Sequence, residues 1–157
     1  MPYALLLCTL AAASDGLVYE LQLRDGKPAV LEGSLALGGG FEPPLVVTDG
    51  AGAAAAIGPL RVVTPRGVRR VQPDVRGQWW IPADATQVRW RMPLPAARNP
   101  FATALRRGRT LQLAVDRVLV RPAELDADAE VRVNVVAPAG LRVVTAWAPL
   151  AAGGFRT

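Results

Sequence analysis

The sequence predicts an all-β fold, an antiparallel β-sandwich of about eight to ten short strands. Three observations lead to this class. Short runs rich in Val and Leu alternate with polar residues, which is the period of a half-buried strand. Fifteen Gly and fourteen Pro are scattered between the runs and supply turns. Helical and strand-like patterns do not alternate along the chain, so a parallel α/β sheet is not expected.

Length and composition indicate one folded domain. The 157 residues are 51% hydrophobic and 20% charged, which is too apolar for a disordered chain and too evenly broken by charge for a membrane protein. We expect residues 1–16 to be a signal peptide and residues 17–157 to form a single β-sandwich domain, with no membrane span.

The first residues are typical of an export signal. Pro2–Ala13 is an uncharged apolar run, too short to span a bilayer, with Ala11 and Ala13 at the two small positions of a cleavage site. The expected location is therefore periplasmic or extracellular. No basic residue precedes the run, so a buried first strand is the alternative. Lipid attachment at Cys8 is disfavoured because Leu7 is not small.

A hairpin is expected to open the domain. Apolar residues alternate with Glu20, Gln22 and Arg24, which predicts a strand with one buried face; its inward residues are Leu17, Tyr19, Leu21 and Leu23. The sequence Arg24-Asp25-Gly26-Lys27 predicts a tight turn, because Asp-Gly readily adopts positive φ. Pro28–Leu37 then forms the second strand.

The segments that follow are less regular. The low-complexity stretches 38–40 and Asp49–Gly58 flank the short apolar segment Leu45–Thr48. The four alanines of Asp49–Gly58 are compatible with a helical turn, but the glycines on both sides favour a flexible surface insertion.

Further strands are expected from the remaining apolar runs. In the clearest one, Val88, Trp90 and Met92 point inward while Arg89 and Arg91 point to solvent. Residues 102–107 are compatible with a short helical turn. The strand candidates are Leu60–Thr64, Val68–Val71, Gln78–Ile81, Gln87–Met92, Leu111–Val115, Val118–Val120, Val131–Val136 and Leu141–Trp147.

The residue types available for chemistry are few. The chain has no His and one Cys, which excludes a Ser-His-Asp triad, a Cys-His dyad, an imidazole zinc site and an internal disulfide. We expect a non-catalytic chain with no cofactor of its own. The acidic cluster of Glu124, Asp126, Asp128 and Glu130 lies between two strands. A solvated turn is the favoured interpretation, over a carboxylate pair or a calcium loop.

The net charge of +5 comes from seventeen Arg and one Lys, a bias typical of a GC-rich, bacterial genome. Arg69 and Arg70 lie near the adjacent Trp79 and Trp80. Arg beside exposed aromatics is one way to bind single-stranded nucleic acid, but a solvated face is favoured and no nucleic acid partner is expected. Neighbours in a strand face opposite ways, so one tryptophan must lie at an interface or under a loop. The expected partner surface is Trp79, Trp80, Arg69 and Arg70.

The closing segments resemble one known family. Val118-Leu-Val-Arg-Pro122 is followed by the alternating Val131-Arg-Val-Asn-Val-Val136 and by Pro138-Ala-Gly-Leu-Arg-Val-Val-Thr145. An Arg-Pro pair, a Val-Arg-Val strand and a Pro-x-Gly turn in this order resemble the amino-terminal domain of metallopeptidase family sixty-one, the glycyl aminopeptidase relatives. The strand-like segments 17–23 and 88–92 also resemble strands of that domain. The sequence departs from the family pattern at Leu141, where family members commonly have Trp.

The resemblance implies a β-sandwich beside a zinc-dependent catalytic domain that carries His-Glu-x-x-His. That motif is not in this sequence, so no active-site residue is transferred and zinc is expected only in a missing catalytic domain. The implied partners are a catalytic peptidase domain in cis and a peptide substrate. The chain is then either a fragment or a detached module.

Two functional hypotheses follow. The first is a non-catalytic amino-terminal β-sandwich domain of an exported zinc aminopeptidase-like protein, supporting the catalytic domain and peptide binding. The second is a free-standing extracytoplasmic β-sandwich that serves as a binding or interaction module. An independent hydrolase using only Asp and Glu is not expected, because the sequence identifies no suitably placed carboxylate pair.

Overall fold

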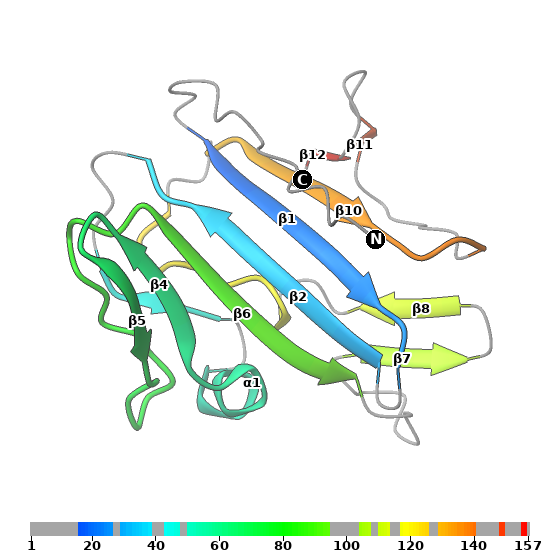
Figure 1. Cartoon of the computed structure of the whole chain (residues 1–157), viewed down its shortest axis with the longest axis horizontal. Helices are drawn as coiled ribbons and strands as arrows, with labels where there is room; N and C mark the ends of the chain where they lie inside the picture. The colour runs from blue at the N-terminus through cyan, green and yellow to red at the C-terminus, as the bar shows by residue number, and fades with distance from the viewer. Residues whose placement is uncertain are drawn as a thin grey trace, which may run out of the picture.

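Strands in which buried and exposed residues alternate form one large sheet in the computed structural model (Figure 1). Its three long central strands are β1 (Leu17–Arg24), β2 (Ala29–Ala36) and β6 (Gln87–Leu94). The structure describes residues 16–26, 29–38, 43–47, 50–94, 104–107, 110–113, 117–125, 129–140, 148–149 and 155–156, and of residues 104–107, 110–113, 148–149 and 155–156 only the backbone.

In the part of the chain that the structure describes, the large sheet has eight strands in the order β11-β12-β10-β1-β2-β6-β4-β5. Its remaining strands are β4 (Leu60–Thr64), β5 (Gly67–Val71), β10 (Val131–Val136), β11 (Ala148–Pro149) and β12 (Phe155–Arg156). Two smaller antiparallel pairs join β3 (Leu45–Val46) to β9 (Arg121–Pro122) and β7 (Ala104–Arg107) to β8 (Thr110–Leu113).

The predicted all-β class is confirmed, and so is the opening hairpin of β1 and β2. The sheet is mixed rather than purely antiparallel, because β10 pairs with β1 in parallel. A parallel neighbour requires a long return connection, and the chain between β1 and β10 supplies it. Within the described residues, the layer facing the large sheet consists of the β3–β9 pair, α1 (Gly50–Ile57) and irregular segments. The structure does not confirm a second extended sheet of sandwich type.

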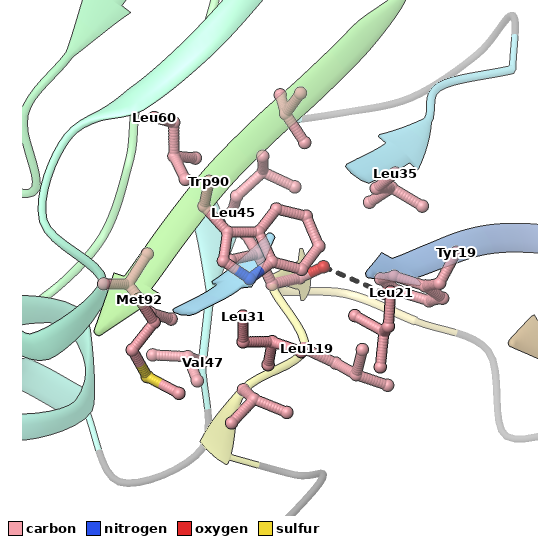
Figure 2. Packing of buried hydrophobic residues seen from close by; sticks show 14 of the residues in the cluster. Tyr19, Leu21, Leu31, Leu35, Leu45, Val47, Leu60, Trp90, Met92 and Leu119 are labelled. Carbon is pink, nitrogen blue, oxygen red and sulfur yellow. Dashed lines mark hydrogen bonds between the residues drawn. The ribbon is translucent and has the colours of Figure 1, made fainter. Parts of the chain in front are cut away.

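The core lies between the sheet and this covering layer (Figure 2). Among its fully buried side chains, Tyr19, Leu31 and Val88 come from the central strands, whereas Leu45 and Val120 come from covering segments. Their removal from water is the main source of stability for a fold without a disulfide. The sheet therefore has one buried face and one face turned to solvent.

A hydrogen bond ties the cover to the sheet. The Tyr19 hydroxyl donates to the carbonyl oxygen of Val120 at 2.9 Å, within the core. Burial raises the pKa of Tyr19, and the nearby positive charge of Arg121 opposes this effect. The phenol therefore stays protonated and retains its donor role. Without this partner the buried carbonyl would carry a desolvation cost of about 1–3 kcal/mol.

The segment 49–58 was expected to be a flexible surface insertion, and this prediction is wrong. Residues Gly50–Ile57 form the helix α1, whose Ala53, Ala54 and Ile57 are buried in the core. Alanine is both a strong helix former and small enough for close packing. Gly58, at φ 71°, ends the helix and donates its N–H to the Ala54 carbonyl at 2.8 Å, so glycine here is a helix cap rather than a flexible spacer.

Several other expected elements differ. Residues 104–107 form the strand β7 and not a helical turn, because pairing with β8 outweighs local propensity. Within the described residues, segment 78–81 makes a single β-bridge, between Trp79 and Leu45, and residues 118–120 are buried without forming a strand. The candidate Leu141–Trp147 and the signal-like residues before Gly16 lie outside the described residues.

Close packing occurs at Gly33 of β2. Gly33 is the cross-strand partner of Trp90 on β6, and a Cβ atom at Gly33 would overlap the indole ring of Trp90. The Trp90 ring therefore lies across a position where only hydrogen is tolerated. It also meets Tyr19 edge-on, with ring centroids 6.4 Å apart and planes at 79°, an arrangement favoured between aromatic rings.

Replacing Gly33 with Ala is expected to destabilise the fold by about 1–3 kcal/mol, because the added methyl must displace the Trp90 ring. The matched control is Gly38→Ala, where an added Cβ meets nothing within 4 Å. Urea unfolding monitored by tryptophan fluorescence measures both variants. Equal stability of Gly33→Ala and the wild type would contradict this account of the packing.

Candidate functional site

The solvent face of the large sheet is polar and hollow. The inward residues of β1, β2 and β6 are apolar, so the alternate residues of the same strands point outward. The hollow over this face has a volume of about 630 Å³. Its charged and amide lining residues are Glu20, Gln22, Glu32, Arg61, Arg70, Gln87, Arg89 and Arg91.

Strand register arranges these side chains in a row. Glu20 on β1 is opposite Ser34 on β2, and Ser34 is opposite Arg89 on β6. Arg89 is in turn opposite Arg61 on β4, and Arg61 is opposite Arg70 on β5. Neighbouring strands lie about 4.8 Å apart. Three arginines on three successive strands therefore share one register line, which we call the arginine row (Arg61, Arg70 and Arg89).

The charges of the arginine row are poorly compensated within the described residues. Glu32 pairs with Arg24, and its carboxylate also lies 3.7 Å from Arg91. Arg89 donates through Nε to the Gln87 side-chain oxygen at 2.8 Å, which neutralises no charge. In the part of the chain that the structure describes, neither Arg61 nor Arg70 makes an ion pair or a side-chain hydrogen bond. Directly opposed like charges are unfavourable in a sheet.

The chemistry suited to this row is anion binding. A guanidinium group presents several N–H donors in one plane and binds carboxylate or phosphate oxygens in pairs. Hydrogen-bond donors of Gln22, Ser34 and Gln87 are also on this face. Among the described residues, no group of three or more His, Cys, Asp or Glu is placed to hold a metal ion.

The two predicted tryptophans face opposite ways, as the sequence indicated. Trp79 is fully buried; its Nε1 donates to the Gly58 carbonyl at 3.0 Å, and its backbone pairs with Leu45. It belongs to the core and has no free surface for a partner. Trp80 is 59% exposed, and its Nε1 donates to Asp74 at 3.3 Å. Trp80 is therefore the one of the pair that a partner can reach.

The predicted arginines separate in the same way. Arg70 belongs to the arginine row, whereas Arg69 is opposite the buried Val62 and so points to the other side of β5. Both are exposed. Of the four predicted site residues, only Arg70 lines the hollow. Sequence reasoning placed Arg89 on a solvent face, which is correct, but it did not identify Arg61 or the row that register creates.

An exposed turn holds Trp80 at the margin of the molecule. The Oδ1 atom of Asp74 accepts the backbone N–H of Arg76 at 2.8 Å and that of Gln78 at 3.0 Å. The backbone hydrogen bond from Gln78 is the largest cause of the lowered pKa of Asp74. Val75, inside this turn, is 95% exposed. Backbone hydrogen bonds also close this turn, from the Asp74 N–H to the Gln78 carbonyl at 2.8 Å and from the Gly77 N–H to the Asp74 carbonyl at 3.0 Å. The carboxylate therefore adds to the order of the turn beside these two exposed apolar side chains.

Comparisons with known proteins add no family. No protein-family model matches the sequence, and no curated protein matches it. Within the described residues, no helix has the length and apolar character needed to cross a membrane.

The turn should loosen in acid. Because the pKa of Asp74 is lowered in the folded chain, the carboxylate orders the turn at neutral pH, and this contribution is lost as pH falls through the lowered pKa. In an NMR titration, the amide signals of Arg76 and Gln78 should move with a midpoint below the ordinary aspartate value of about 3.9. Asp74→Asn should abolish this transition. A midpoint at or above the ordinary value would contradict the proposed hydrogen-bonding pattern.

Proposed function

We propose that this chain is a non-catalytic β-domain that serves as a binding module and engages an acidic partner through the solvent face of its sheet. The observation that carries the proposal is the arginine row, in which three guanidinium groups on neighbouring strands share a hollow with few opposing carboxylates. The paired strands fix the spacing of the three Cα atoms, so only the side chains, and not the backbone, must be ordered when a partner binds.

The composition of the hollow favours an acidic partner over a catalytic role. Among the described residues, the carboxylates that line it are Glu20 and Glu32, and Glu32 already pairs with arginine. Arginine has no proton to exchange near neutral pH, so the row supplies charge and hydrogen bonds rather than acid–base chemistry. Carboxylate-rich protein segments are suited to such a surface, because each carboxylate accepts two parallel N–H donors.

A narrower form of the proposal associates the domain with a zinc aminopeptidase-like protein, where it would support the catalytic domain and peptide substrate. What favours this form is the resemblance of the closing segments, together with the pairing of two resembling segments, β1 and β10, as neighbouring strands. In the parent gene, the reading frame after Thr157 should then encode a His-Glu-x-x-His motif. A stop codon at that point would leave the free-standing extracytoplasmic module.

The binding role is tested by changing the row without changing its backbone. The variant Arg61→Gln/Arg89→Gln removes two of its charges, and Arg66→Gln/Arg76→Gln removes two exposed arginines that do not line the hollow. A hydrogen bond to a charged group is worth about 1.5–3 kcal/mol. The row variant should therefore bind a Glu-rich peptide at least about tenfold more weakly than the wild type in calorimetry.

The control variant carries the same net charge as the row variant and should retain most of the wild-type affinity. A Lys-rich peptide of equal length should not bind either protein. If the two variants lose affinity equally, attraction depends on overall charge and the hollow is not the site. If the wild type binds no Glu-rich peptide, the proposed function is wrong.

A further inference from the structure

The strand β5 is the last strand at one end of the described sheet (Figure 1). In the described part of the chain it pairs only with β4, over residues 60–64 and 67–71. The other end of the sheet is the two-residue strand β11, which is too short to template another strand effectively. An edge strand presents the N–H and C=O groups of alternate residues to solvent, and the five-residue strand β5 does so at this edge.

The side chains of β5 leave this edge accessible. Residues Gly67 to Arg70 are all exposed, and Val68 retains 65% of its surface. Val68 and Arg70 are on the hollow side of the strand, opposite Val63 and Arg61, whereas Arg69 is on the other side. A strand added here would therefore meet an apolar side chain and a guanidinium group on one face and a second guanidinium group on the other.

Charge determines which strand fits. The segment Arg66–Val71 contains three arginines and no acidic residue, so a second copy of β5 aligned along the edge would bring like charges together. A strand with acidic residues at alternate positions would instead place its carboxylates on one face, beside Arg70. On the hollow side, its carboxylate would take the next position along the arginine row, about 4.8 Å beyond Arg70. The same residues thus disfavour self-association and favour an acidic extended segment.

We propose that β5 binds an acidic, extended peptide segment of the partner as an additional strand, with backbone hydrogen bonds along the edge and carboxylates beside Arg70 on the hollow side. The inference rests on the proposed function, which it refines by giving the partner a conformation and a register. Main-chain pairing then supplies affinity, and alternate acidic side chains supply selectivity.

The decisive probe is a peptide of alternating Glu and Val and its two N-methylated forms. An added strand uses the N–H groups of every second residue to pair with the edge, and the remaining N–H groups point away. Methylation of one alternate set of peptide nitrogens should weaken binding at least tenfold, whereas methylation of the other set should leave the affinity within about threefold. Peptide binding should also slow hydrogen exchange of backbone amides in β5.

Two protein variants complete the design. Arg70→Gln should bind the unmethylated peptide at least tenfold more weakly, while Arg69→Gln, with the same net charge but on the opposite face of β5, should bind nearly as well as the wild type. If both methylated peptides bind like the parent peptide while Arg61→Gln/Arg89→Gln still weakens binding, strand addition is wrong and the acidic-partner function stands. If the wild type binds none of these peptides, both proposals fail.

Discussion

Buried and solvent-facing residues alternate along β1, β2 and β6, and the three strands pair in one register. Both faces of the sheet depend on this constraint. The inward residues of these strands are buried against the covering segments, except for the partly buried Leu17, so the residues between them must face solvent. A slip of one residue would expose Tyr19 and Trp90 and bury Glu20 and Arg89. The hydrophobic core and the arginine row are therefore two consequences of the same pairing, and burial of the apolar face is what holds the charged face in place.

Specific contacts in the core make this register hard to change. Trp90 fits only where its cross-strand partner is Gly33, and the Tyr19 hydroxyl reaches the Val120 carbonyl only when β1 holds its present position. The Nε1 atom of Trp90 is buried without a hydrogen-bond partner within the described residues, a cost that the packing of the large ring offsets. A core fixed in this way can tolerate the repulsion between the opposed arginines on its outer face.

The sequence predicted most of the sheet and little of the site, for one physical reason. The strands at residues 17–24, 60–64 and 131–136 were predicted to within a residue. Burial of one face makes apolar and polar residues alternate, and this alternation is visible within each short segment of sequence. The helix α1 was missed because tertiary packing, which is not visible in the sequence, buries its alanines. The glycines on both sides of the alanines indicated a loop instead. The row was missed because it depends on which strands are neighbours, and β6 lies between β2 and β4 although all three are separated in sequence.

Spacing explains why the row behaves differently from the same arginines scattered over the surface. Three guanidinium groups on successive strands span about 10 Å, which is close to the Debye length of about 8–10 Å at moderate ionic strength. The electrostatic potentials of the three charges therefore add up at this distance, whereas charges that lie much farther apart than the Debye length are screened from one another. The acidic residues of the same face, Glu20 and Glu32, lie toward β1 and β2, so the face is electrostatically asymmetric across its strands. A partner with carboxylates at one margin would accordingly be oriented toward β5 as well as attracted, because turning it around would bring like charges together at Glu20.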